Sequence, residues 1–216
     1  MARSSTAKFA PTQVGSPNAA IRDTRPCSWL LDSLRAPDAR TKLAASKGLR
    51  DLSRREPARV YPHFDDVALL LTHQNNILKW NAILTLAHLA RVDEERKLDR
   101  ILDAYLAPIT GPVMITAANT IKGAALIAQA RPDLASPIVA SLLRVEKAVY
   151  ASPECRNVAI GHVLTAFAKL SRLVPDTRRI RLFAARHIRN PRAATAAKAR
   201  SLAASSALAS KPRSRS

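Results

Sequence analysis

Aromatic side chains and glycine are both scarce in this sequence. Only 4% of the 216 residues are Phe, Trp or Tyr and only 5 are Gly, although 47% are apolar. Alanine and leucine therefore supply most of the apolar content, which favours close-packed helices over sheets. The 14 prolines gather at segment boundaries. This composition predicts an all-α protein with a substantial hydrophobic core.

Cysteine and long apolar runs are also nearly absent. Cys27 and Cys155 have no spacing that is typical of a metal knuckle or a disulfide framework, which fits a reducing compartment. The N-terminal residues MARSSTAKFAPTQVGSP lack the apolar stretch of a signal peptide, and no run of about 18 apolar residues exists for a membrane span. We therefore expect a cytoplasmic protein without a membrane partner.

Acidic residues are few, and they are rarest towards the C-terminus. The net charge of the whole chain is +19. Residues 171–216 contain 12 Lys or Arg and the single acid Asp176, a net charge of +11, whereas residues 42–170 carry +5 and residues 1–41 carry +3. Most of the basicity is thus a C-terminal feature, and the expected folded body is mildly basic.

A repeat of 38 residues is the strongest pattern in the sequence. Asn81, Asn119 and Asn157 are separated by this interval both times. Each asparagine is followed four positions later by a small residue and nine positions later by alanine: Thr85, Gly123 and Gly161, then Ala90, Ala128 and Ala166. Such a repeat predicts stacked helix pairs that share one core. We expect the asparagines to form a structural ladder between repeats, the alternative being that they line a binding face.

Four helix pairs follow from this period and from the prolines between segments. The first helices are expected at 38–55, 77–91, 113–130 and 154–173, and the second helices after Pro62 and at 96–106, 137–149 and 176–188. The predicted organisation is a flexible N-terminal segment over 1–27, an α-solenoid over 28–190, and a basic, Ala-rich tail over 191–216 that is partly helical or disordered.

The period, the paired helices, the apolar–small–alanine pattern and the proline-marked turns resemble HEAT repeats over about residues 38 to 190. The segments YPHFDDVALLL, ILKWNAILTLAHLARVD and SPECRNVAIGHVL are also similar to a group of bacterial HEAT-like repeat proteins without assigned activity. The resemblance implies a right-handed α-solenoid of about four HEAT-like helix pairs. It further implies a concave face that binds proteins, peptides or nucleic acid.

Enzymes that share this architecture do not match the sequence. HEAT-like di-iron hydroxylases use His-Glu pairs as ligands, and none of the five histidines precedes a glutamate. HEAT-like alkylpurine DNA glycosylases place Trp and Asp beside Arg, whereas Leu84 stands one turn after Trp80 and no carboxylate is near it. A glycosylase therefore stays a remote alternative, and nothing indicates the bilin site of a phycobilin lyase. We expect no enzymatic activity, no metal and no cofactor.

Two acidic clusters and one cysteine have simpler interpretations than catalysis. Asp65–Asp66 and Asp93–Glu95 lie near expected helix starts, where negative charge is favourable, and are interpreted in that way rather than as metal sites. Cys155 precedes Arg156 at an expected helix start, an environment that lowers a thiol pKa. We interpret this cysteine as a small packing residue.

The basic C-terminal region supports a second functional hypothesis. Apolar residues and arginines alternate over 178–188, which predicts a capping helix with a solvated basic side. The candidate nucleic-acid contacts are Arg178, Arg179, Arg181, Arg186 and Arg189, with Lys79 and Lys122 as secondary candidates in the body. The preferred hypothesis is a scaffold or adaptor that binds another protein. The alternative is a nucleic-acid-associated protein that contacts phosphates without sequence preference.

Overall fold

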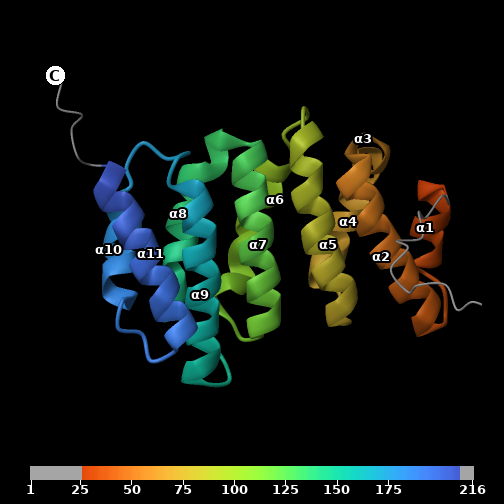
Figure 1. Ribbon diagram of the computed structural model, residues 1–216. Coiled ribbons are helices and arrows are strands. Elements are labelled where there is room, and N and C mark those ends of the chain that lie inside the picture. Colours follow the sequence, from red (N-terminus) through yellow and green to blue (C-terminus); the bar gives the residue numbers. More distant parts are fainter. Residues whose placement is uncertain (1–25, 210–216) are drawn as a thin grey trace, which may run out of the picture.

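The computed structural model describes residues 26–209, and every regular element in that range is helical (Figure 1). The predicted N-terminal segment lies almost wholly outside the described residues, as do residues 210–216 of the predicted tail. The α-helices are α1 (Cys27–Ser33), α2 (Ala39–Arg55), α3 (Pro57–Val60), α4 (Phe64–Leu69), α5 (Asn76–Leu89), α6 (Lys97–Leu106), α7 (Met114–Ala130), α8 (Ala135–Leu142), α9 (Pro153–Leu170), α10 (Arg178–His187) and α11 (Ala193–Ala209). Short 3₁₀ segments extend several of them, including η3 (Ala90–Val92) and η6 (Leu143–Lys147).

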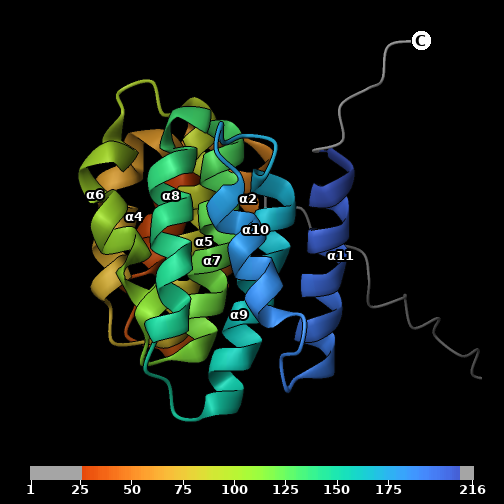
Figure 2. The ribbon, with the colours of Figure 1, turned by 90° about the vertical axis from the view of Figure 1, so that its left-hand side faces the viewer.

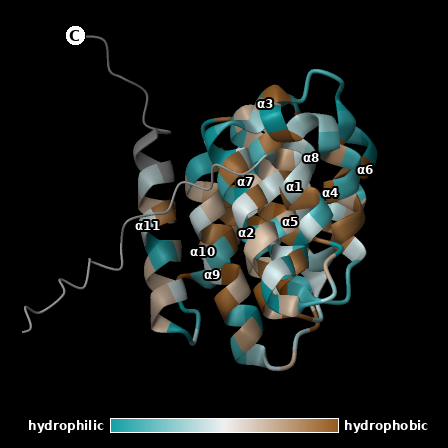
Figure 3. Cartoon of the chain, turned by 90° about the vertical axis from the view of Figure 1, so that its right-hand side faces the viewer, coloured by the Kyte–Doolittle hydropathy of each residue, from teal (hydrophilic) through white to brown (hydrophobic). Residues whose placement is uncertain are grey.

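The helices form two rows. The long helices α2, α5, α7, α9 and α11 pack side by side in this order, and we refer to them as the front row (Figure 1). The shorter helices α4, α6, α8 and α10 lie behind them as the back row. In the side views of Figures 2 and 3, α11 lies at the front-row edge of the molecule and α6 lies at the opposite edge. The front row therefore bends towards the front at its C-terminal end. The all-α class and the consecutive packing predicted from the repeat are confirmed.

The hydrophobic core lies between the two rows. It includes large, fully buried side chains from both: Leu49, Phe64, Ile83, Leu98, Tyr105, Phe167 and Phe183. Phe167 of α9 meets Phe183 of α10 edge to face, with 5.3 Å between ring centroids. This geometry is favourable for aromatic rings, and it fixes α10 against the front row.

Helix α11 belongs to the packed array, whereas the sequence placed residues 191–216 in a tail. It packs against α9 and α10 and buries Thr195, Ala196, Ala199 and Leu202. Two hydrogen bonds tie it to backbone carbonyls of α9, from the Thr195 hydroxyl to Asn157 at 2.9 Å and from Lys198 to Gly161 at 3.2 Å. The small side chains of α11 can lie close to α9, where Gly161 faces Thr195.

In two repeats, the small residue four positions after the asparagine is required by a close contact. A Cβ atom on Gly123 of α7 would lie 1.9 Å from the hydroxyl oxygen of Tyr105, which donates a hydrogen bond to the carbonyl of Ile83 at 2.9 Å. A Cβ atom on Gly161 of α9 would lie 2.7 Å from the hydroxyl oxygen of Thr195 in α11. Each glycine therefore makes room for a hydroxyl group from a neighbouring helix.

The asparagine ladder expected from the repeat is not formed by the described side chains. Asn81 forms hydrogen bonds with two side chains of α2: it accepts one from Arg50 and donates one to Ser46, both at 2.9 Å. Asn119 instead donates to a carbonyl of its own helix, and Asn157 accepts from Asn190, which precedes α11. Only the first of the three reaches back to the preceding repeat. The common spacing reflects a shared position on the helices, and the partners differ because the facing surfaces differ.

A buried carboxylate links three consecutive repeats. The side chain of Asp93 is fully buried. One of its oxygens accepts from the Tyr61 hydroxyl and the Lys97 amide, both at 2.8 Å, and the other accepts from the Leu98 amide at 3.1 Å and from Arg131 at 3.0 Å. Asp93 therefore caps α6 and holds the end of α7 against the preceding repeat. The sequence predicts that the cluster Asp93–Glu95 is favourable because it lies near a helix start, and this is only part of the role of Asp93.

Candidate anion-binding groove on the front row

Acidic and basic side chains are unequally divided between the two rows. Helices α5, α7 and α11 contain no Asp or Glu, and the only acids of α2 and α9 are Asp51 and Glu154. Asp51 is paired with Arg50, and Glu154 is paired with Arg192. From residue 56 onward, the remaining acids of the described chain lie in the back row and the turns. The front row therefore presents a surface of predominantly positive charge.

Cavities open along this positive surface. One of about 550 Å³ lies between α2, α5 and α7 and is lined by Arg54, Ala87, His88, Arg91, Leu126, Gln129 and Ala130. The next, of about 310 Å³, lies between α7 and α9 and is lined by Ala118, Asn119, Ile121, Lys122, Ala125, His162, Thr165, Ala166 and Lys169. None of the described residues that line these two cavities is acidic. We refer to the pair of cavities as the basic groove.

Several cations in the groove are available to a ligand. The side chains of Arg54, Lys122 and Lys169 are exposed, and none forms an ion pair with another described residue. Arg91 is held in place because its guanidinium donates to the backbone carbonyl of Arg54 at 2.6 Å. The groove thus combines fixed and free cations, as a surface that contacts phosphate groups requires.

Two histidines of the groove have lowered pKa values, mainly because of burial and then because of nearby cations. Burial, followed by the charges of Arg91, Arg54 and Arg50, lowers the pKa of His88 to about 4. Burial and the charges of Lys198 and Arg192 also lower the pKa of His162. Both side chains are therefore neutral at pH 7. An anion that enters the groove would offset the repulsion that disfavours their protonated forms.

None of the five predicted arginines lines this groove. They are on α10 or just after it, in the back row: Arg178, Arg179, Arg181, Arg186 and Arg189. Arg186 forms an ion pair with Glu146 at 2.8 Å, which compensates its charge. Arg181 lines a further cavity at the C-terminal end of the front row. The five residues therefore do not form one continuous front-row site.

Two candidates from the sequence line the groove: Lys122, a candidate contact, and Asn119, one of the repeated asparagines. Of the two secondary candidates, Lys122 lies in the groove and Lys79 is half-buried in α5. Lys169 and Arg54 were not singled out. The signal that could have found them is the scarcity of acids in the first helices, which contain none in α5 and α7 and one each in α2 and α9, because those helices form one continuous face when they stack.

Metal-binding groups, reactive cysteines and membrane-spanning helices would each indicate another kind of function. Within residues 26–209 no three His, Cys, Asp or Glu side chains are grouped so that they could hold a metal ion. Cys27 is buried, and this burial raises the pKa of its thiol, while Cys155 is half-buried at the start of α9. In the same range, no helix has both the length and the apolar character needed to cross a bilayer.

Comparison with known proteins supports the fold alone. No family model and no curated protein matches the chain. Among solved structures, the chain is similar to the crystal structure of an engineered protein, a Northeast Structural Genomics Consortium target, with a TM-score of 0.52 and 13% sequence identity. The match covers 83% of this chain and 78% of that chain. This chain therefore shares a helical architecture with a solved structure, and its function has to be inferred from its own surface.

Proposed function

We propose that this chain is a non-enzymatic, right-handed solenoid of the HEAT type whose front row binds the phosphate backbone of duplex nucleic acid. The observation that carries the proposal is the exclusion of unpaired acids from the front row, together with free cations in the basic groove. Neutralised phosphates release counterions, and this gives binding that depends strongly on salt and little on sequence. The proposed setting is the cytoplasm.

Duplex is a better fit than single-stranded nucleic acid. Proteins that bind single strands stack successive bases on aromatic side chains. The chain is poor in such residues, and Trp80 of α5 already donates its indole N–H to the hydroxyl of Thr116 at 2.8 Å. Five front-row helices at spacings of about 8–10 Å span roughly 40 Å, which is close to one helical turn of duplex, about 34 Å.

The protein-scaffold hypothesis has less support from the same surface. Protein interfaces are enriched in aromatic residues and depleted in lysine. The groove shows the opposite composition, since Lys122 and Lys169 line one of its two cavities and no Phe, Tyr or Trp lines either. A protein partner with a strongly acidic surface remains the alternative that the experiments below address.

Charge reversal in the groove is expected to weaken duplex binding. The variant Lys122→Glu/Lys169→Glu replaces two free cations between α7 and α9 with carboxylates. We expect its affinity for a labelled duplex of about 20 base pairs to fall by roughly 10- to 100-fold at about 100 mM salt, and the salt slope to fall by about two units. Fluorescence anisotropy across a salt titration measures both quantities.

The matched control reverses two exposed cations of the back row, Arg100→Glu/Arg144→Glu, and produces the same change in net charge. Its affinity should stay within about threefold of the unmodified chain, because exposed charges beyond a Debye length are screened. Equal losses in both variants would assign the binding to overall charge and overturn the groove. No binding of duplex DNA or RNA by the unmodified chain would reject the proposal in favour of an acidic protein partner.

Duplex binding is also expected to raise the pKa of His88. In the free protein this pKa is about 4, because burial and three nearby arginines disfavour the charged ring. Bound phosphates would compensate those arginines, so the pKa should move up towards its ordinary value. By linkage, affinity should then rise as pH falls through the bound-state pKa, and stop rising near pH 4. NMR titration of the histidine ring protons, assigned with His88→Gln, measures the shift.

The duplex-deficient variant Lys122→Glu/Lys169→Glu provides the control for this titration. Added duplex should leave its His88 curve unchanged at concentrations that shift the unmodified protein. A titration curve that is the same with and without saturating duplex in the unmodified protein would place the bound strand away from the cavity of Arg54 and Arg91.

A further inference from the structure

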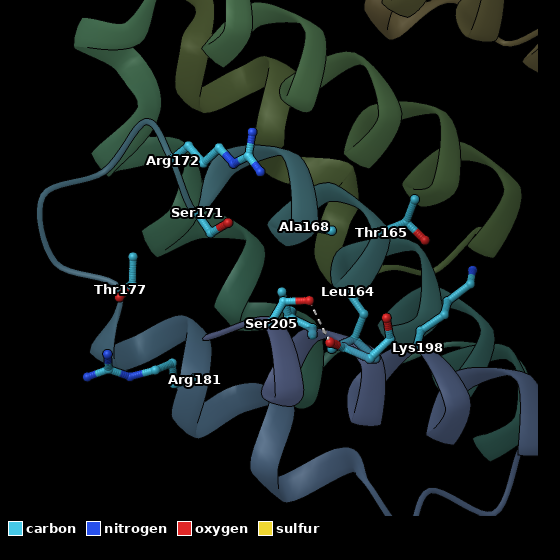
Figure 4. Close-up of a pocket in the computed structure, with 11 residues that line it drawn as sticks. Leu164, Thr165, Ala168, Ser171, Arg172, Thr177, Arg181, Lys198 and Ser205 are labelled. Atoms are coloured by element: carbon cyan, nitrogen blue, oxygen red, sulfur yellow. Dashed lines mark hydrogen bonds between the residues drawn. The ribbon is translucent and has the colours of Figure 1, made fainter. Parts of the chain in front are cut away.

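A separate cavity of about 530 Å³ lies between α9, α10 and α11, at the C-terminal end of the front row (Figure 4). It is lined by Leu164, Thr165, Ala168, Ser171, Arg172, Thr177, Arg181, Lys198, Ser201, Leu202 and Ser205. Three of these side chains are cationic, five carry a hydroxyl group, and none of the described lining residues is acidic. The volume falls in the range of about 300–1,000 Å³ that is typical of small-molecule sites.

The three cations leave donors free for a ligand. The guanidinium groups of Arg172 and Arg181 form no hydrogen bond or ion pair with another described residue. Lys198 donates one hydrogen bond to the carbonyl of Gly161 at 3.2 Å, and an ammonium group has three donors. The nearby carboxylate of Asp176 does not line the cavity, and it accepts from the backbone amide of Arg178 at 2.8 Å.

The positions of these cations indicate the kind of anion. Figure 4 shows Arg172, Arg181 and Lys198 at separate edges of the cavity, with their charged ends directed apart and with Ser171, Thr177 and Ser205 between them. Two linked phosphate groups present oxygens in more directions than a single compact anion does, and they suit cations that lie at separate edges. Arginine and hydroxyl donors suit phosphate oxygens, because charge-assisted hydrogen bonds to ionised groups are the strong ones.

The cavity exists because α11 is docked. Lys198, Ser201, Leu202 and Ser205 all come from this helix, and Leu164 and Ala168 of α9 supply the apolar wall. No aromatic side chain lines the cavity, so the wall offers nothing on which a base could stack. Recognition therefore has to come from the phosphate groups.

We propose that the cavity between α9, α10 and α11 binds the diphosphate group of a small molecule. Arg172 and Arg181 contact one phosphate group each, and Lys198 and the serine hydroxyls donate to the remaining oxygens. This site lies beyond the basic groove and does not depend on duplex binding.

The test is isothermal titration of the full chain with inorganic pyrophosphate at constant ionic strength, with inorganic phosphate, ADP and sulfate in parallel. We expect saturable binding of one pyrophosphate per chain, and binding of phosphate and sulfate at least about tenfold weaker. If ADP binds as tightly as pyrophosphate, the diphosphate group that the cavity recognises can belong to a nucleotide. ADP binding much more weakly would assign the site to diphosphates without a base, and either result agrees with the proposal.

Variants separate this cavity from general charge. Arg172→Met/Arg181→Met should weaken pyrophosphate binding by about tenfold or more. Arg178→Met/Arg179→Met removes the same charge from residues that do not line the cavity and should change the affinity less than about twofold. Ser201→Leu fills the cavity without altering charge and should also abolish binding. Thermal melting of each variant checks that the fold is kept.

The proposal is overturned if the unmodified chain shows no saturable pyrophosphate binding, or if both arginine pairs weaken it equally. It is also overturned if sulfate binds as tightly as pyrophosphate, since the cavity would then hold any anion. None of these results bears on the basic groove, because duplex binding is measured with the variants at Lys122 and Lys169.

Discussion

The variant Gly123→Ala is expected to lose about 3 kcal/mol or more of unfolding free energy. The added Cβ atom would lie 1.9 Å from the hydroxyl oxygen of Tyr105, and that ring is fully buried and cannot swing outward. Overpacking a core costs about 1–3 kcal/mol, and displacing the Tyr105 hydroxyl also breaks its buried hydrogen bond to Ile83, a further 1–3 kcal/mol or so. Urea denaturation of the purified variant measures the loss.

A double-mutant cycle with Tyr105→Phe tests the cause of this loss. The phenylalanine removes the clashing oxygen, and the nearest remaining ring atom, Cζ, lies 3.2 Å from the added Cβ atom, a gap that small shifts can widen. The double variant should therefore be clearly more stable than the sum of the two single losses implies. Additive losses would show that Gly123 matters for another reason, such as the conformation of its helix.

The variant Asp93→Ala is expected to lose about 3–5 kcal/mol, because it leaves Arg131 and two α6 amides without their buried partner. Burial, and after it the hydrogen bond to Asp93, raises the pKa of Tyr61 to about 12. In the variant, the Tyr61 hydroxyl would lose this acceptor as well. Urea denaturation at pH 7 again provides the measurement. The expected loss is large because one carboxylate satisfies groups from three consecutive repeats.

The matched control is Asp133→Ala, which removes a different carboxylate from the same arginine. Asp133 lies 2.7 Å from Arg131, but its side chain is 44% exposed. Solvent screens such a pair, so we expect a loss of at most about 1 kcal/mol. If the two variants lost similar free energies, Arg131 itself would be the important group, and the buried position of Asp93 would carry no special weight.

The helix pairs were predictable from the sequence because the signal is local and repeated. Proline positions and apolar periodicity placed the first helices close to α2, α5, α7 and α9. Helix α11 was missed as part of the array because its apolar residues are mostly alanine, which is equally compatible with a solvated helix. Its docking depends on Gly161 and on carbonyls of α9, and a single sequence does not reveal that surface.

The links between repeats were harder to predict than the helices. The asparagines share a period, but whether each finds a partner depends on the residue opposite, and only Asn81 meets side chains of the preceding front-row helix. Asp93 has no counterpart at the same period, so the repeat gave no reason to select it. Of the residues that line the groove, the sequence indicated Lys122 as a candidate contact and Asn119 only under the alternative that the asparagines line a binding face, whereas the approach of Lys169 from α9 is a consequence of packing.

The order of packing in the front row has a consequence for how the chain reaches its native state. Each front-row helix packs mainly on the one before and the one after it, so contacts join segments that are close in the sequence. Little chain entropy is lost in closing such short loops, and folding can begin at any repeat and spread outward. Nascent chain leaving the ribosome would thus acquire structure one unit at a time, and helix α11 would complete the cavity for phosphate last.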